Sequence, residues 1–151
     1  MTGYTVVQVS EASGATYRQI DYWARTGLVV PSVAQARGEG TKRIYSFEDV
    51  ILCRLVVVLS GDGRGRDLPR GGGIGSLVRE ALAIGESGWF LAIPAGGPPI
   101  VTCEPAAVIA EAHTVVTLVD LDAVRHHVTA ALRSTENEAA GARTPDGLLT
   151  R

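Results

Sequence analysis

The segment from Gly14 to Gly27 most constrains the fold, because it reads as a tight turn followed by one short helix with a defined start and end. Thr16 is placed to cap this helix, since its hydroxyl can accept a hydrogen bond from a backbone N–H of the first turn. Gly27 stands where a left-handed residue commonly ends a helix. Ile20 and Trp23 are three residues apart and share one face, which we expect to point inward.

The remaining positions of this helix carry basic and aromatic side chains, namely Tyr17, Arg18, Tyr22 and Arg25. Guanidinium groups contact phosphates or guanine edges, and tyrosine hydroxyls donate to phosphates. Such a surface is typical of a helix that enters the major groove of DNA. Arg and Tyr are also common on ordinary helix surfaces, so this segment alone leaves both interpretations open.

A shorter helix is predicted before this segment, with Thr5 as its N-cap and Val6 and Val9 on its inner face. Two short helices joined by a turn that contains glycine form a helix-turn-helix. Downstream, residues 28–30 are predicted to be extended, and residues 42–45 alternate polar and apolar side chains as a strand does. The two strands would enclose a glycine-bearing loop and form a hairpin, or wing.

Two longer motifs support this arrangement. Residues 18–32 read R-x-x-x-Y-W-x-x-x-G-L-x-x-P-S, and residues 43–50 read R-I-Y-S-x-E-D-V. Together with the preceding helix and turn, residues 4–59 resemble the N-terminal winged helix-turn-helix of the MerR family of transcription regulators. The wording of residues 19–27 resembles an actinobacterial branch of that family.

The resemblance implies that residues 16–26 form the major-groove helix and that Arg43 is the phosphate-contacting arginine of the wing. One position departs from the family pattern, because Asp21 stands where a basic residue is common. We expect Asp21 to cap locally or to pair with Arg25 four residues later. The candidate DNA-binding residues are Thr16, Tyr17, Arg18, Tyr22, Arg25, Arg37, Lys42, Arg43 and Tyr45.

Charge and glycine content divide the chain. Residues 1–75 hold nine Lys/Arg against seven Asp/Glu, and residues 76–151 hold five against nine. Residues 60–75 hold seven glycines and three arginines, so we expect a loop. The alternative is a basic arm that contacts phosphate, because residues 63–66 (Gly-Arg-Gly-Arg) loosely resemble the core of an AT-hook peptide.

The back half predicts a small α/β module. Residues 89–93, 100–103 and 114–119 read as strands, residues 105–112 as a short helix, and residues 121–132 as a last helix with one apolar stripe. We therefore predict an α+β fold in which a MerR-like winged helix-turn-helix (residues 1–87) precedes a ββαβα module (residues 88–133) for dimerisation or for effector or partner binding. Residues 134–151 are polar and are predicted to be a disordered tail.

The long coiled-coil helix through which many MerR-type regulators dimerise has no counterpart here. If the protein is a dimer, either the strand at residues 114–119 or the stripe of the last helix must form the interface. The alternative for that stripe is packing against its own sheet.

The leading hypothesis is a sequence-specific transcription regulator that binds promoter or operator DNA as a homodimer. RNA polymerase and a small-molecule effector are further partners left open. The alternatives are an architectural, excisionase-like accessory factor, or a docking module whose winged domain binds a protein such as a sigma factor.

We predict no cofactor, no metal site and no enzymatic activity. Metal sensors of the family use clustered cysteines, whereas this chain offers Cys103 with the scattered histidines His113, His126 and His127. No nucleophile–base spacing is recognisable. The longest aliphatic run is far shorter than a membrane span, and the N-terminus lacks an export leader, so we expect a cytoplasmic protein without a membrane partner.

Overall fold

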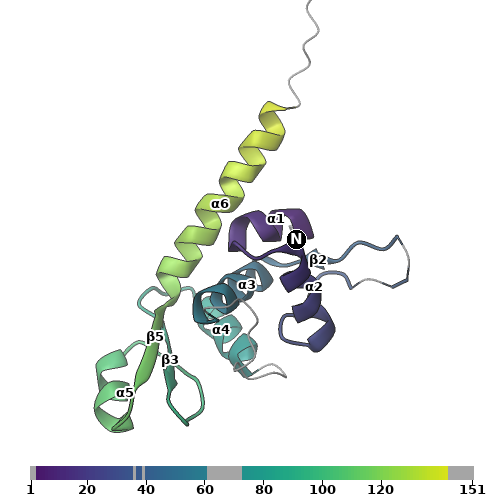
Figure 1. Cartoon of the computed structure of the whole chain (residues 1–151). Helices are drawn as coiled ribbons and strands as arrows, with labels where there is room; N and C mark the ends of the chain where they lie inside the picture. The colour runs from purple at the N-terminus through teal and green to yellow at the C-terminus, as the bar shows by residue number, and fades with distance from the viewer. Residues whose placement is uncertain (1–2, 36, 39, 61–72, 143–151) are drawn as a thin grey trace, which may run out of the picture.

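The computed structural model describes residues 3–35, 37–38, 40–60 and 73–142. The described chain mixes helices and strands, and it confirms the predicted α+β class with a C-terminal module in the order ββαβα (Figure 1). The elements are β1 (Tyr4–Thr5), α1 (Val6–Ser13), α2 (Tyr17–Thr26), β2 (Ile44–Tyr45), α3 (Phe47–Leu59), α4 (Gly73–Ile84), β3 (Phe90–Pro94), β4 (Ile100–Thr102), α5 (Pro105–Ala112), β5 (Val116–Asp120) and α6 (Leu121–Gly141).

The first three helices begin with the same device. In each, the N-cap hydroxyl accepts from the backbone N–H three residues on, and the side chain at that later position accepts from the backbone N–H of the cap. This reciprocal capping box satisfies two backbone donors that the first turn leaves without partners. The cap pairs are Thr5 with Gln8, Thr16 with Gln19 and Ser46 with Asp49.

The wing differs from the predicted hairpin. Residues 28–30 form no strand, because the N–H groups of Leu28 and Val29 both donate to the Trp23 carbonyl and so continue the cap of α2. Val29 is buried. Ile44 instead pairs with Ala34 through an isolated bridge and with Thr5 through the antiparallel β1–β2 pair. The wing is therefore tied to the N-terminal strand.

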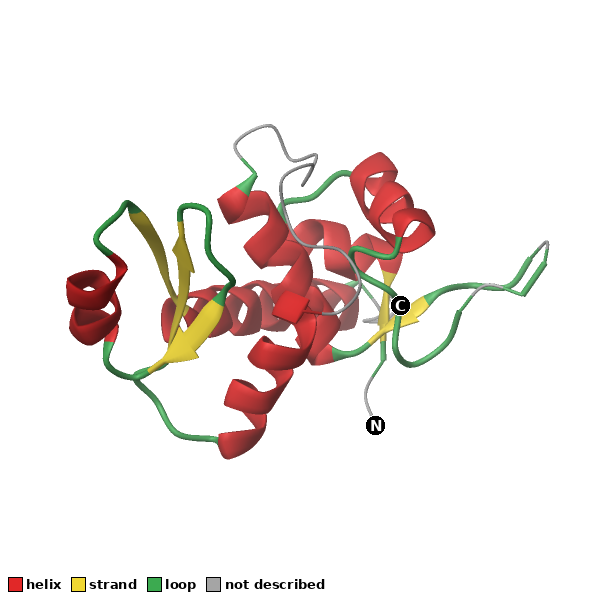
Figure 2. Cartoon of the chain, turned by 90° about the horizontal axis from the view of Figure 1, so that it is seen from below, coloured by secondary structure: helices red, strands yellow, loops and turns green. Residues whose placement is uncertain are grey.

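The C-terminal module contains a three-stranded antiparallel sheet in the order β4-β3-β5. Leu91 of β3 lies opposite Val101 of β4 and Val119 of β5, so these apolar side chains share one face. Helix α5 contacts β3 and β5. In both views this sheet lies at one end of the molecule and the wing at the other (Figures 1 and 2).

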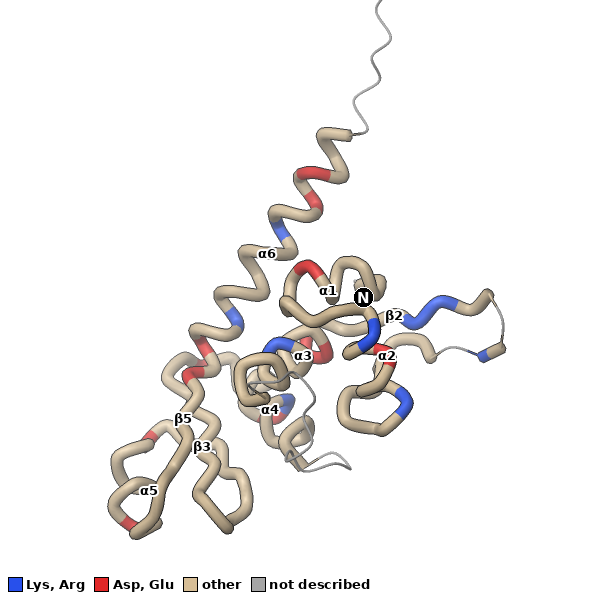
Figure 3. The backbone as a smooth tube through the Cα atoms, viewed as in Figure 1, with Lys and Arg blue, Asp and Glu red and all other residues tan. Residues whose placement is uncertain are grey.

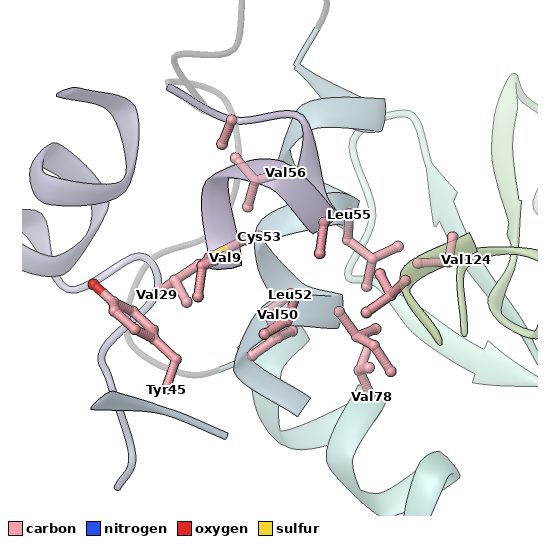
Figure 4. Close-up of a cluster of buried hydrophobic side chains, with 14 of the residues drawn as sticks. Val9, Val29, Tyr45, Val50, Leu52, Cys53, Leu55, Val56, Val78 and Val124 are labelled. Carbon is pink, nitrogen blue, oxygen red and sulfur yellow. The ribbon is translucent and has the colours of Figure 1, made fainter. Parts of the chain in front are cut away.

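One hydrophobic core runs through both halves of the chain. It includes Val9 of α1, Leu55 of α3, Val78 of α4 and Val124 of α6 (Figure 4). The apolar stripe predicted for the last helix is buried, as expected from its spacing: Leu121, Val124, Val128 and Leu132. However, α6 packs against α1 and α3 as well as β3, so the stripe covers the winged domain in addition to its own sheet.

Two predicted boundaries are wrong. The tail predicted from Ser134 does not begin there, because α6 continues to Gly141. Alanine and glutamate favour helix, and the Ser134 and Thr135 hydroxyls donate to carbonyls four residues earlier. At the glycine-rich joint, Gly73 and Gly75 belong to α4. The basic arm predicted around residues 63–66 lies outside the described residues.

Candidate nucleic-acid interface

Helix α2 has one buried face and one exposed face. Ile20 and Trp23 are buried in the core and fix the helix against the body of the domain. The side chains of Tyr17, Arg18, Tyr22 and Arg25 are exposed, as predicted. Thr16 caps the helix at the end nearest the turn. A short helix held from behind and covered with guanidinium and phenol groups suits contact with a polyanion.

Hydrogen bonds hold the turn before α2 in place. Gly14 adopts a left-handed conformation with φ of 78°, and its N–H donates to the Ser10 carbonyl at 3.0 Å. The Ser10 hydroxyl donates to the Ala15 carbonyl at 2.6 Å, and the Ala15 N–H donates to the buried Ser13 hydroxyl. These contacts join the end of α1 to the start of α2.

The wing adds further cations beside α2 (Figure 3). Arg37 and Lys42 are exposed, and the Thr41 hydroxyl donates to the Arg37 carbonyl at 2.8 Å. A cleft of about 570 Å³ lies between the wing and the start of the chain. It is lined by Thr5, Val6, Val7, Tyr17, Gly40, Thr41, Lys42 and Arg43. Tyr17 and the two basic side chains of this lining are among the predicted contact residues.

Arg43 is paired within the protein, which its predicted role did not anticipate. Its Nη1 donates to Oδ1 of Asp21 at 2.6 Å, and Nε of Arg25 donates to Oδ2 of the same carboxylate at 2.9 Å. The expected pairing of Asp21 with Arg25 is therefore present, together with a second partner 22 residues away in the sequence. The hydrogen bond from Arg43 is the largest cause that holds the pKa of Asp21 below its ordinary value, so the carboxylate is ionised.

Tyr45 must be removed from the predicted contact residues. Its side chain is fully buried, and its hydroxyl has no hydrogen-bond partner within the described chain. Burial raises the pKa of Tyr45 to about 12. Alternation along a strand places neighbouring side chains on opposite faces, and here the face of Tyr45 is the core.

A buried carboxylate from the second motif joins the wing to the body of the domain. Asp49 is fully buried, and its Oδ2 accepts from the N–H and hydroxyl of Ser32 and from the Ser46 N–H. Its Oδ1 accepts from Nη2 of Arg79 on α4 at 2.7 Å. The Pro31-Ser32 turn, the start of α3 and α4 therefore converge on one side chain. Both Ser32 and Asp49 lie in the motifs quoted above, and their separation of 17 residues hid the contact.

The candidate metal ligands do not come together. The described residues contain no group of three or more His, Cys, Asp or Glu side chains that could hold a metal ion. Cys103 is exposed, and Cys53 is buried in α3, where burial raises the pKa of its thiol. Of the helices the structure describes, none has the length and apolar character needed to cross a membrane.

Two helices joined by a hydrogen-bonded turn, followed by a wing on the same surface, define a winged helix-turn-helix protein. Residues 4–64 match the family model described as the MerR HTH family regulatory protein. The N-terminal part of the chain is thus a MerR-family helix-turn-helix domain.

Curated relatives are similar over part of the chain. Uncharacterized HTH-type transcriptional regulators of Mycobacterium bovis and Mycobacterium tuberculosis are 46% identical over 63 residues. The similar segment covers 42% of this chain and 28% of the length of each relative. The similarity therefore covers less than half of this chain and less than a third of each relative.

Proposed function

We propose that this protein is a sequence-specific DNA-binding transcription regulator of MerR type. Helix α2 would enter the major groove, and the wing would lie on the flanking backbone. The exposed face of α2 carries the proposal, because Tyr17, Arg18, Tyr22 and Arg25 project from a helix whose other face is buried. The family match and the names of the relatives support the same conclusion.

Separate residues would supply affinity and sequence reading. Arg18 and Tyr22 are four residues apart on α2, so they share a face that can reach base edges. Arg37 and Lys42 are on the wing and would contact phosphates, which carry no sequence information. Thr16, at the start of α2, would contact the backbone near the helix N-terminus, where backbone N–H groups favour anions.

The test is chromatin immunoprecipitation of the tagged protein, followed by footprinting of the purified protein on the strongest site. An inverted repeat at a few promoters is expected for a dimeric regulator. Arg18→Ala should weaken binding to that site by roughly ten- to a hundredfold, as expected for loss of a bidentate base contact. Arg133→Ala, which removes an exposed arginine from α6, is the matched control and should bind normally.

Two other outcomes would redirect the assignment. Broad, weak occupancy without a repeated sequence would favour an architectural, excisionase-like factor. The absence of any DNA binding, together with retention of a bacterial RNA polymerase subunit or sigma factor that Arg18→Ala abolishes, would favour a protein-docking role. Asp21 gives that last alternative some support, because it offsets part of the positive charge of the surface.

Dimerisation through β5 is part of the proposal. The stripe of α6 is buried within the subunit, which leaves the strand as the remaining one of the two interfaces considered. β5 is an edge strand of its sheet, and the exposed side chains on and next to it include Leu118 and Val115. An exposed strand edge offers backbone groups to a second strand, and a two-fold axis would pair β5 with its copy.

A further inference from the structure

Asp21 is the acidic residue that lies within the proposed DNA-binding surface and contacts two of its arginines. Tyr17, Asp21 and Arg25 are spaced four residues apart, so they lie along one side of α2. Arg43, at the base of the wing, reaches across to the same carboxylate. Both carboxylate oxygens are used, one by each arginine.

A carboxylate and a phosphate present similar acceptors to a guanidinium group. Arginine binds both through charge-assisted hydrogen bonds, and the same N–H groups cannot serve both acceptors at full strength. Arg43 and Asp21 side chains are 27% and 28% exposed, so the pair is within reach of a ligand that approaches the surface. Arg25 is more exposed, at 64%.

We propose that Asp21 is an internal competitor for DNA phosphate, which weakens sequence-independent binding by occupying Arg25 and Arg43. This inference rests on the proposed DNA-binding function. Non-specific binding depends almost entirely on phosphate contacts, so a competitor at the phosphate-binding arginines lowers it directly. Asp21 does not pair with Arg18 or Tyr22, so it does not weaken their base contacts. These base contacts therefore supply a larger share of the affinity for DNA.

Among the described residues, other basic side chains of the same surface are not paired with a carboxylate. Within the described chain, the ion pairs are Asp21 with Arg25, Asp21 with Arg43, and Asp49 with Arg79. Arg18 and Lys42 are in none of them. The competition is thus confined to the junction between α2 and the base of the wing, where both elements would meet the backbone.

The test is Asp21→Asn, measured by fluorescence anisotropy with a labelled DNA duplex of scrambled sequence over a series of salt concentrations. We expect the affinity to rise by roughly three- to tenfold at moderate salt, the range for release of an exposed ion pair and its repulsion of phosphate. The slope of log affinity against log salt should steepen by about one for each arginine released to a phosphate.

Two further variants separate competition from other effects. Glu111→Gln removes the same charge from α5, at the opposite end of the molecule, and should change the affinity little (Figure 1). In the double variant Asp21→Asn/Arg43→Gln, most of the gain should disappear, because Arg43 is no longer available. Circular dichroism and thermal melts verify that each variant is folded.

The outcomes distinguish the inference from the function on which it rests. If Asp21→Asn binds the scrambled duplex as weakly as the wild type or more weakly while Arg18→Ala still impairs binding to the footprinted site, the competitor role is wrong and Asp21 only positions Arg43. If neither the wild type nor Asp21→Asn binds any DNA at low salt, the DNA-binding function and the inference are both overturned.

Discussion

At the scale of single residues, Asp49 joins three separate segments of the chain. It is fully buried and accepts four hydrogen bonds from Ser32, Ser46 and Arg79. Asparagine has the same shape but replaces one acceptor oxygen with a donor and removes the negative charge that pairs with Arg79. We expect Asp49→Asn to lower the free energy of unfolding by about 2–4 kcal/mol, as for other broken buried pairs.

Chemical unfolding followed by circular dichroism measures this loss. Glu48→Gln is the matched control, because it also removes an acidic side chain from the first turn of α3 but lies at a half-buried position. It should change the stability by at most about 1 kcal/mol through the helix dipole. Equal effects of the two variants would show that the convergence on Asp49 contributes no stability of its own.

Tyr45 leads to a prediction about alkaline stability. Its folded pKa of about 12 lies above the ordinary value of 10.0, so its contribution to stability is fully present below pH 10 and is lost as the pH rises toward 12. A shift of about two units corresponds to about 2–3 kcal/mol. Tyr45→Phe removes the titrating group, and also removes a buried hydroxyl that has no partner in the described chain.

Tyr45→Phe should therefore be at least as stable as the wild type at pH 7 and should lose less stability between pH 10 and pH 12. Urea unfolding at both ends of this range provides the measurement. Exposed Tyr17→Phe is the control, and it should leave the alkaline profile unchanged. A variant that lost stability at pH 7 would indicate that the hydroxyl has a partner, such as a buried water molecule.

Local features of the interface were predictable from the sequence, whereas distant contacts were not. Thr16 as a cap, Gly27 as a helix end and the pairing of Asp21 with Arg25 depend on separations of a few residues, where backbone geometry is fixed. The Arg43–Asp21 pair joins residues 22 positions apart across two elements. Nothing in the spacing of the two motifs specifies that distance, because it depends on how the wing folds back.

At the scale of elements, the end of α2 depends on the backbone conformation of Gly27. Its φ is 77°, a region that residues with a Cβ rarely adopt, and no heavy atom lies within 4 Å of the place a Cβ would occupy. Strain alone is therefore responsible for the expected cost of Gly27→Ala, about 1 kcal/mol. Gly73→Ala, at the start of α4 and also in open space, should be neutral or stabilising by up to about 1 kcal/mol.

Thermal melts should therefore show a lower midpoint for Gly27→Ala and an unchanged or higher midpoint for Gly73→Ala. DNA affinity supplies a second measurement, because only Gly27 lies at the end of the proposed recognition helix. A loss of stability in Gly73→Ala as large as that in Gly27→Ala would show that the conformation at Gly27 has no special role.

The edge strand β5 gives a prediction about assembly. A lysine introduced at an exposed strand edge is a common barrier to edge-to-edge pairing. Leu118→Lys should convert a dimer into a monomer, as measured by light scattering coupled to size exclusion. Ile84→Lys places the same change at an exposed position at the end of α4 and should leave the assembly intact. A dimer that tolerates Leu118→Lys would place the interface elsewhere.

The sequence pattern of the C-terminal module predicts its strands and helices, but it does not predict how they pack. The spacing of the apolar stripe in α6 predicted which side chains of that helix are buried. The stripe could equally have covered its own sheet or a second subunit, because an apolar face does not specify its partner. The contact with α1 and α3 became apparent only from the arrangement of the whole chain.

At the scale of the whole molecule, this packing joins the winged domain and the C-terminal module through one hydrophobic core. α6 crosses from β3 to α1 and α3, and its buried side chains belong to the same core as Trp23. We therefore expect a destabilising substitution in α6 to destabilise α2 as well, although the two helices are far apart in the sequence. Independent folding of the two halves would give the opposite result.

Leu132→Ala tests this coupling in a Trp89→Phe background, so that Trp23 is the remaining tryptophan and its fluorescence reports on the winged domain. Leu132 is 4% exposed, and its truncation should lower the free energy of unfolding by about 2–4 kcal/mol. The Trp23 transition should shift with the loss of helix measured by circular dichroism. Ile84→Ala, at a position 53% exposed at the end of α4, should shift neither. A Trp23 transition unaffected by Leu132→Ala would mean that the winged domain folds without α6.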